Sequence, residues 1–183
     1  MQYICKMNSL FKMRTVLIVS LFLCLYSCNE SNNKNKKSKI PEQTIAIISK
    51  TDISKLKFTE FILDDKAKRS LESWEKYFEL NTIVNNAKQA DFSFFTDNNE
   101  IILAFIKDIK SSIPDTVNTP LILARLIALE TKMLKLEAVL NFSNQEKKET
   151  LLLLKEFFVS FSNLNFQINK KFEKESQNIQ KPY

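Results

Sequence analysis

Apolar residues recur at intervals of three and four from Phe58 to about residue 177, with polar residues between them. This spacing places the apolar side chains on one face of an α-helix, whose period is 3.6 residues. This part of the chain shows no alternation of apolar and polar residues of the kind that marks a half-buried strand. The pattern predicts an all-α fold with helices at approximately 64–88, 98–112, 120–141 and 144–177.

Residues that favour helix ends lie near the borders of three of these segments. Residues 119–120, Thr-Pro, read as an N-cap followed by proline at the first helical position, where the missing N–H costs nothing. Asp97 with Glu100, and Ser143 with Glu146, have the spacing of capping boxes. Short connections between four helices predict an antiparallel bundle that forms a single domain.

The third predicted helix carries the broadest apolar stripe. Its main positions alternate spacings of four and three: Ile122, Leu126, Leu129, Met133, Leu136 and Leu140, flanked by Leu123, Ile127 and Leu134. A stripe of this breadth faces more than one neighbour. We therefore expect this helix to be central in the bundle, or to serve also as an oligomer seam, which makes a homodimer a hypothesis.

The segment before the helices is less clearly specified. Ile45, Ile47 and Ile48 fit either a short strand or a helix that docks on the body, and Pro41 favours neither. Residues 29–39 contain no apolar side chain, so we expect them to form a flexible polar tether.

The chain begins with the pattern of a bacterial leader. Three basic residues precede an apolar run from Val16 to Tyr26: Lys6, Lys12 and Arg14. The run is too short to span a bilayer and has the length of a signal peptide core. An ordinary secretory peptide and an uncleaved anchor are the alternatives. The initiating residue is left open among three methionines: Met1, Met7 and Met13.

The cysteine that would be lipidated follows from the residues before it. Ser27 supplies the small residue required before Cys28, whereas Cys24 follows Leu23. Leu25 fits the third position before the cleavage site. We therefore expect Cys28 to carry the lipid and to anchor the protein in a bilayer.

The chain thus divides into a lipoprotein signal peptide at 1–27, a lipidated cysteine with its tether at 28–50, and a helical-bundle domain at 51–183. The chain has 27 Lys and Arg against 21 Asp and Glu, but the excess lies in the leader and the tether. Basic and acidic residues are equal in number in the third part. This balance argues against a nucleic-acid partner.

Several absences limit the chemistry. The chain has no glycine and no histidine, so it lacks a P-loop, a dinucleotide fingerprint, a nucleophile elbow and the commonest general base and metal ligand. Leader removal would leave Cys28 as the one cysteine, without a disulfide or zinc cluster. The remaining candidates are carboxylate pairs, which we interpret as helix caps or solvated faces: Asp64 with Asp65, Glu72 with Glu75, and Asp97 with Glu100. We expect no enzyme activity, cofactor or metal.

Three groups of aromatic residues are candidates for binding. Trp74 lies on the apolar stripe of the first helix, where core packing is favoured over a binding role. The cluster Phe92, Phe94 and Phe95 fits a plug at the end of the core better than an exposed anchor for a partner. A third group widens the fourth helix, and one member is expected to face a helix of another chain: Phe157, Phe158 and Phe161.

The chain resembles the plasmid-encoded outer-surface lipoproteins of Borrelia in three features: the Leu-Tyr-Ser-Cys sequence ending at Cys28, the Asn- and Lys-rich tether, and the glycine-free helical body. The helical members of that group include complement regulator-acquiring proteins. No binding residue of that family is matched to a position here. The resemblance implies an outer-membrane surface lipoprotein that binds a host or vector protein. The alternatives are a carrier of lipid or another apolar ligand in the bundle core, an antigenic or structural coat protein, and display on the periplasmic face.

Overall fold

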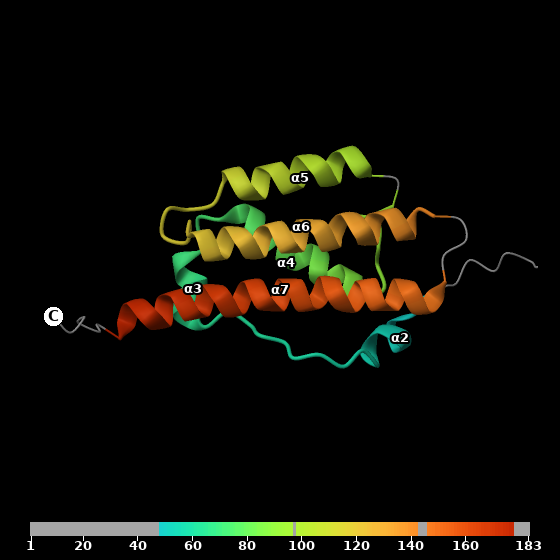
Figure 1. The fold of residues 1–183 in the computed structure, drawn as a ribbon, viewed down its shortest axis with the longest axis horizontal. Helices are drawn as coiled ribbons and strands as arrows, with labels where there is room; N and C mark the ends of the chain where they lie inside the picture. Colours follow the sequence, from blue (N-terminus) through green and yellow to red (C-terminus); the bar gives the residue numbers. More distant parts are fainter. Residues whose placement is uncertain (1–47, 97, 143–145, 178–183) are drawn as a thin grey trace, which may run out of the picture. The chain divides into compact units, whose positions relative to one another are not determined.

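The computed structural model describes residues 48–96, 98–142 and 146–177, all within the compact unit Gln43–Tyr183. These residues form α-helices and no strand, which confirms the all-α class (Figure 1). The helices in the described ranges are α2 (Lys50–Ser54), α3 (Asp65–Ser70), α4 (Glu75–Lys88), α5 (Asn99–Ser111), α6 (Pro120–Leu140) and α7 (Lys147–Ser176).

The segment that the sequence left open forms a short helix, α2, at its C-terminal end. Ser49 and Asp52 make a reciprocal capping box: the Asp52 amide donates to Ser49 Oγ at 3.2 Å, and the Ser49 amide donates to Asp52 Oδ2 at 2.9 Å. Ile48 and Ile53 bury their side chains in the core. Ile45 and Ile47 lie outside the described residues.

The first predicted helix, 64–88, is wrong as a single element because the chain forms α3 and α4 with a turn between them. Asp64 caps α3 as expected, and its carboxylate accepts a hydrogen bond from the Ala67 amide at 2.7 Å. Trp74 then leaves the helical region, with φ −97° and ψ 72°. Its indole Nε1 donates to the Ile109 carbonyl at 3.3 Å, so a tertiary contact holds the break.

The start of α5 agrees with the prediction within one residue and that of α7 lies three residues later, but the N-cap residue of each helix differs from the predicted one. Helix α5 begins at Asn99, and Asn98 at its N-cap donates its side-chain amide to the Ser93 carbonyl at 2.9 Å instead of capping the helix. Helix α7 begins at Lys147, with Glu146 at the N-cap and no capping bond from its side chain. Asp97 and Ser143, the predicted caps, lie outside the described residues. The third start is confirmed, since Thr119 Oγ1 accepts from the Ile122 amide at 3.3 Å.

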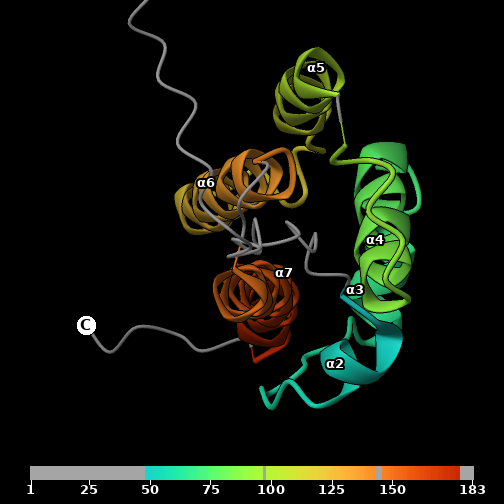
Figure 2. The same cartoon turned by 90° about the vertical axis from the view of Figure 1, so that its right-hand side faces the viewer.

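Helices α6 and α7 lie side by side and the chain reverses direction between them (Figure 1). Helix α5 contacts both α6 and α4, while α3 contacts α7 and α2 contacts α4 (Figure 2). The broad stripe of α6 therefore faces two neighbours, as expected. One continuous core joins all these elements, and its largest fully buried side chains include Trp74, Phe95, Leu80, Ile102, Ile122, Leu136, Phe157 and Phe158.

Helix α4 ends in a Schellman motif without glycine. The Asp91 amide donates to the Asn86 carbonyl at 3.0 Å, and the Ala90 amide donates to the Ala87 carbonyl at 3.0 Å. Ala90 takes the left-handed conformation, with φ 65°. Glycine is the usual residue at this position because a Cβ atom is strained there.

Candidate functional site

The residue with a predicted chemical role, Cys28, lies outside the described residues, so its lipidation stays a prediction. None of the helices described is both long enough and apolar enough to cross a bilayer.

The carboxylate pairs have the surroundings of caps and solvated faces. Asp64 is the α3 cap, Asp65 is exposed in the first turn of α3, and Glu72 and Glu75 are exposed beside the break before α4. Glu100 is exposed on α5. Within the described ranges, the His, Cys, Asp and Glu side chains form no group able to hold a metal ion.

The aromatic clusters belong to the core. Trp74 and Phe95 are 0% exposed, and the Phe95 ring meets the Phe157 ring edge-on at 5.5 Å between centroids. Phe92 and Phe94 are half-buried against the same core, so the cluster plugs it as predicted.

The expectation that Phe157, Phe158 or Phe161 faces another chain is wrong, because all three side chains are buried within this one. The Phe58 ring stacks on the Phe158 ring at 5.8 Å, and the Tyr77 ring stacks on the Phe161 ring at 6.0 Å. The chain thus covers its own aromatic face with α4 and with the segment that follows α2.

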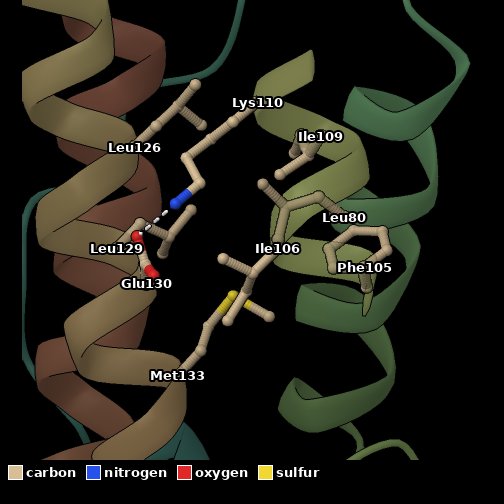
Figure 3. A pocket seen from close by; sticks show the side chains of 9 residues that line it. All are labelled: Leu80, Phe105, Ile106, Ile109, Lys110, Leu126, Leu129, Glu130 and Met133. Carbon is tan, nitrogen blue, oxygen red and sulfur yellow. Dashed lines mark hydrogen bonds and ion pairs between the residues drawn. The ribbon is translucent and has the colours of Figure 1, made fainter. Parts of the chain in front are cut away.

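The narrow pocket between α4, α5 and α6 has a volume of about 10 Å³. Apolar side chains line it, and the Lys110 Nζ pairs with Glu130 Oε2 at 2.9 Å beside it (Figure 3). This volume is about that needed for one water molecule. A carrier of lipid or another apolar ligand in the bundle core requires a cavity of several hundred Å³, far more than this pocket provides.

A row of polar side chains on α7 holds the extended segment 59–64 against the helix. Ser162 Oγ accepts from the Phe61 amide at 2.7 Å and donates to the Thr59 carbonyl at 3.0 Å. Asn165 Nδ2 donates to the Phe61 carbonyl at 3.0 Å. Asn169 accepts from the Asp64 amide at 3.1 Å through Oδ1 and donates to the Ile62 carbonyl at 2.7 Å through Nδ2. These bonds give an isolated extended segment the backbone partners that a sheet normally supplies.

This segment and α7 together present exposed apolar side chains, which we call the phenylalanine patch: Phe61 and Phe166, whose rings meet, and Ile62, the next residue along the segment. The Phe61 and Phe166 rings lie 4.7 Å apart, and Lys170 Nζ lies 5.7 Å from the Phe166 ring centroid. Ile62 is 75% exposed. The apolar periodicity of the sequence does not mark these residues as a surface.

A second apolar surface lies at the other end of α7, and we call it the leucine hollow: Leu56, Leu151 and Leu152. Lysine and glutamate side chains form its rim, and its volume is about 530 Å³. Leu152 is 56% exposed. Residues 152 and 166 are separated by about 21 Å along the helix at 1.5 Å per residue.

Comparison of the chain with protein-family models, with curated proteins and with solved structures finds no match. The described residues form a small all-helical domain with a closed core, and its exposed apolar surfaces include the phenylalanine patch and the leucine hollow.

Proposed function

We propose that the protein is a lipid-anchored bacterial surface lipoprotein whose helical domain is a non-catalytic binding module for a host or vector protein. The phenylalanine patch is the observation that carries this proposal. Ile62 is 75% exposed, Phe61 is 37% exposed and Phe166 is 36% exposed, although hydrogen bonds from α7 fix the backbone on which Phe61 and Ile62 lie. A rigid apolar surface loses little conformational entropy on binding.

The patch also favours a particular kind of partner surface. Lys170 lies over Phe166 and pairs with Glu173 at 2.6 Å, so a polar rim borders the aromatic rings. An apolar centre with a polar rim is the usual organisation of a protein–protein interface. The leader and tether, which resemble those of Borrelia outer-surface lipoproteins, support display outside the cell and a host or vector protein as partner.

The carrier alternative has less support. A lipid or similar ligand held in the bundle core needs a cavity of roughly 300 Å³ or more, whereas the pocket between α4, α5 and α6 has about 10 Å³ and the larger leucine hollow lies open on the surface. Its apolar lining packs closely, so opening it for a ligand would expose core side chains.

Capture of serum and vector proteins on the immobilised chain tests the proposal. We expect Ile62→Lys to reduce capture at least tenfold, because a lysine in the patch would be desolvated on binding. Ile127→Lys is the matched control, since Ile127 is 56% exposed on α6, away from the patch. Equal capture by both variants would exclude the patch as the binding surface. If the chain retains no protein and native lipid co-purifies with it, the carrier becomes the better proposal.

A further inference from the structure

The leucine hollow lies where the segment after α2 meets the first turns of α7. Leu56, Leu151 and Leu152 form an apolar floor, and the Asp52 carboxylate pairs with Lys147 Nζ at 2.7 Å to hold α2 at this end of α7. Leu152 is more than half exposed, while Leu56 and Leu151 are half-buried. The hollow is thus an open apolar surface at one end of the bundle.

Lysines outnumber carboxylates around this hollow. Lys148 and Lys155 line the hollow together with Glu146 and Glu149, and the exposed Lys55 and Lys57 flank its Leu56 in the sequence. Lys147 and Lys148 also begin α7, where the helix dipole disfavours cations. The excess positive charge at this end therefore attracts an anionic partner.

The chain that leads from Cys28 enters the domain at this same end. Ile48 is the first described residue, and α2 begins two positions later. The chain between Cys28 and Ile48 reaches at most about 70 Å when fully extended. An acylated Cys28 would therefore keep the leucine hollow within that distance of the bilayer, at a high local concentration of lipid headgroups.

We propose that the leucine hollow and its lysines dock the domain on an anionic bilayer surface, with the lysine Nζ groups on headgroup phosphates and the leucines at the acyl boundary. This inference rests on the proposed lipid anchor. In this proposed arrangement α7 stands on the bilayer with its N-terminal end towards the lipid, which leaves the phenylalanine patch about 20 Å further along α7 and free to meet a partner. The domain is thus oriented by the membrane rather than only attached to it.

Fluorescence depth measurement on the full chain tests the proposal. The chain, expressed with its own leader and purified from membranes, is reconstituted into vesicles of phosphatidylcholine with phosphatidylglycerol and a brominated lipid as quencher. The sequence has no cysteine after Cys28, so Leu152→Cys and Phe166→Cys each supply one labelling site in the mature chain. We expect quenching of the label at position 152 and not at 166, and quenching of neither in phosphatidylcholine alone. Equal quenching at both positions, or none at 152, would overturn docking.

Charge variants separate docking from anchoring. Each lysine near an anionic surface raises binding about fivefold, so Lys148→Gln with Lys155→Gln should lower the docked-to-undocked ratio by roughly tenfold or more. Lys107→Gln with Lys135→Gln removes the same charge from exposed positions on α5 and α6 and should change the ratio less than twofold. Similar losses in both pairs would overturn the proposed surface.

Flotation of the vesicles reports the anchor independently. A chain that floats but keeps an unquenched label at position 152 is anchored and does not dock, which overturns this inference alone. If Cys28 carries no acyl group its thiol also takes the label, so this case is measured as the difference between the Leu152→Cys chain and the unsubstituted chain. Quenching of the added label when anionic lipid is in excess supports docking and contradicts the anchor. Capture of a host or vector protein is measured separately on the phenylalanine patch.

Discussion

The Tyr77 hydroxyl on α4 donates a hydrogen bond to Asn165 Oδ1 on α7 at 2.8 Å, inside the core. Asn165 also makes a second hydrogen bond, in which its Nδ2 donates to the Phe61 carbonyl at 3.0 Å. One buried side chain therefore joins α4, α7 and the extended segment that carries the phenylalanine patch. Burial raises the pKa of the Tyr77 hydroxyl well above its ordinary value, so the hydroxyl keeps its proton and remains a donor.

Asn165→Ala should lower the free energy of unfolding by about 2–3 kcal/mol, because it removes the acceptor of the buried Tyr77 hydroxyl and the donor to the half-buried Phe61 carbonyl. Urea unfolding followed by circular dichroism measures this loss. Asn163→Ala is the matched control, since Asn163 is half-buried two positions earlier on α7, and we expect a change below about 0.5 kcal/mol.

The double variant tests whether the contact itself is responsible. Tyr77→Phe removes the donor, so Asn165→Ala should cost less in the Tyr77→Phe background than in the wild type. Strictly additive losses would mean that the two side chains stabilise the fold independently.

The pH dependence of stability should contain a contribution from Asp52. The ion pair with Lys147, followed by the bonds from Ser49, holds the pKa of the Asp52 carboxyl well below its ordinary value of 3.8. A lowered pKa in the folded state means that the ionised carboxylate stabilises the fold above about pH 4, and that this stabilisation is lost progressively at lower pH.

Asp52→Asn should therefore lower the urea midpoint at pH 7, and its difference from the wild type should narrow as the pH falls below 4. Asp115→Asn, an exposed change in the loop before α6, controls for the loss of one negative charge. A difference that stays constant from pH 7 to pH 2 would contradict the assigned role.

Ala90 occupies a left-handed position that glycine usually takes, so a glycine there should stabilise the fold. Its φ of 65° strains an alanine by about 1 kcal/mol, a strain that glycine lacks. We expect Ala90→Gly to raise the free energy of unfolding by roughly 0.5–1 kcal/mol, whereas Ala104→Gly, at an exposed position inside α5, should lower it by a similar amount. Destabilisation by Ala90→Gly in thermal melts would show that the Schellman motif is not strained.

The period of apolar residues predicted the helical class because it reports the buried face of each helix, but it did not predict where the first helix breaks. Ala67, Leu71 and Trp74 continue a helical spacing through the break, so no local signal marks it. The break depends on the bond from the Trp74 indole to Ile109, a residue distant in the chain. Contacts of this kind are set by the whole fold and override local propensity.

The phenylalanine patch was missed for a related reason. Ser162, Asn165 and Asn169 are polar residues at helical spacing beside the apolar stripe of α7, and this signal was available. Their partners are backbone groups of residues 59–64, an extended segment with no periodicity of its own. The way this segment lies on α7 determines which of its apolar side chains are covered and which stay exposed. Phe58 is covered, whereas Ile62 is exposed.

Lipidation at Cys28 requires cleavage of the leader between Ser27 and Cys28. Incorporation of labelled palmitate into growing cells should be abolished by Cys28→Ser and retained in Cys24→Ser, because Ser27 and not Leu23 fits the position before cleavage. Mass spectrometry should find a wild-type chain that begins at Cys28 and carries acyl groups, and a Cys28→Ser chain that keeps its leader. If Cys24→Ser abolishes the label instead, cleavage occurs four residues earlier. If the wild-type chain carries no lipid and neither variant alters its processing, the leader is an ordinary secretory peptide or an uncleaved anchor. The domain then reaches the membrane by other means.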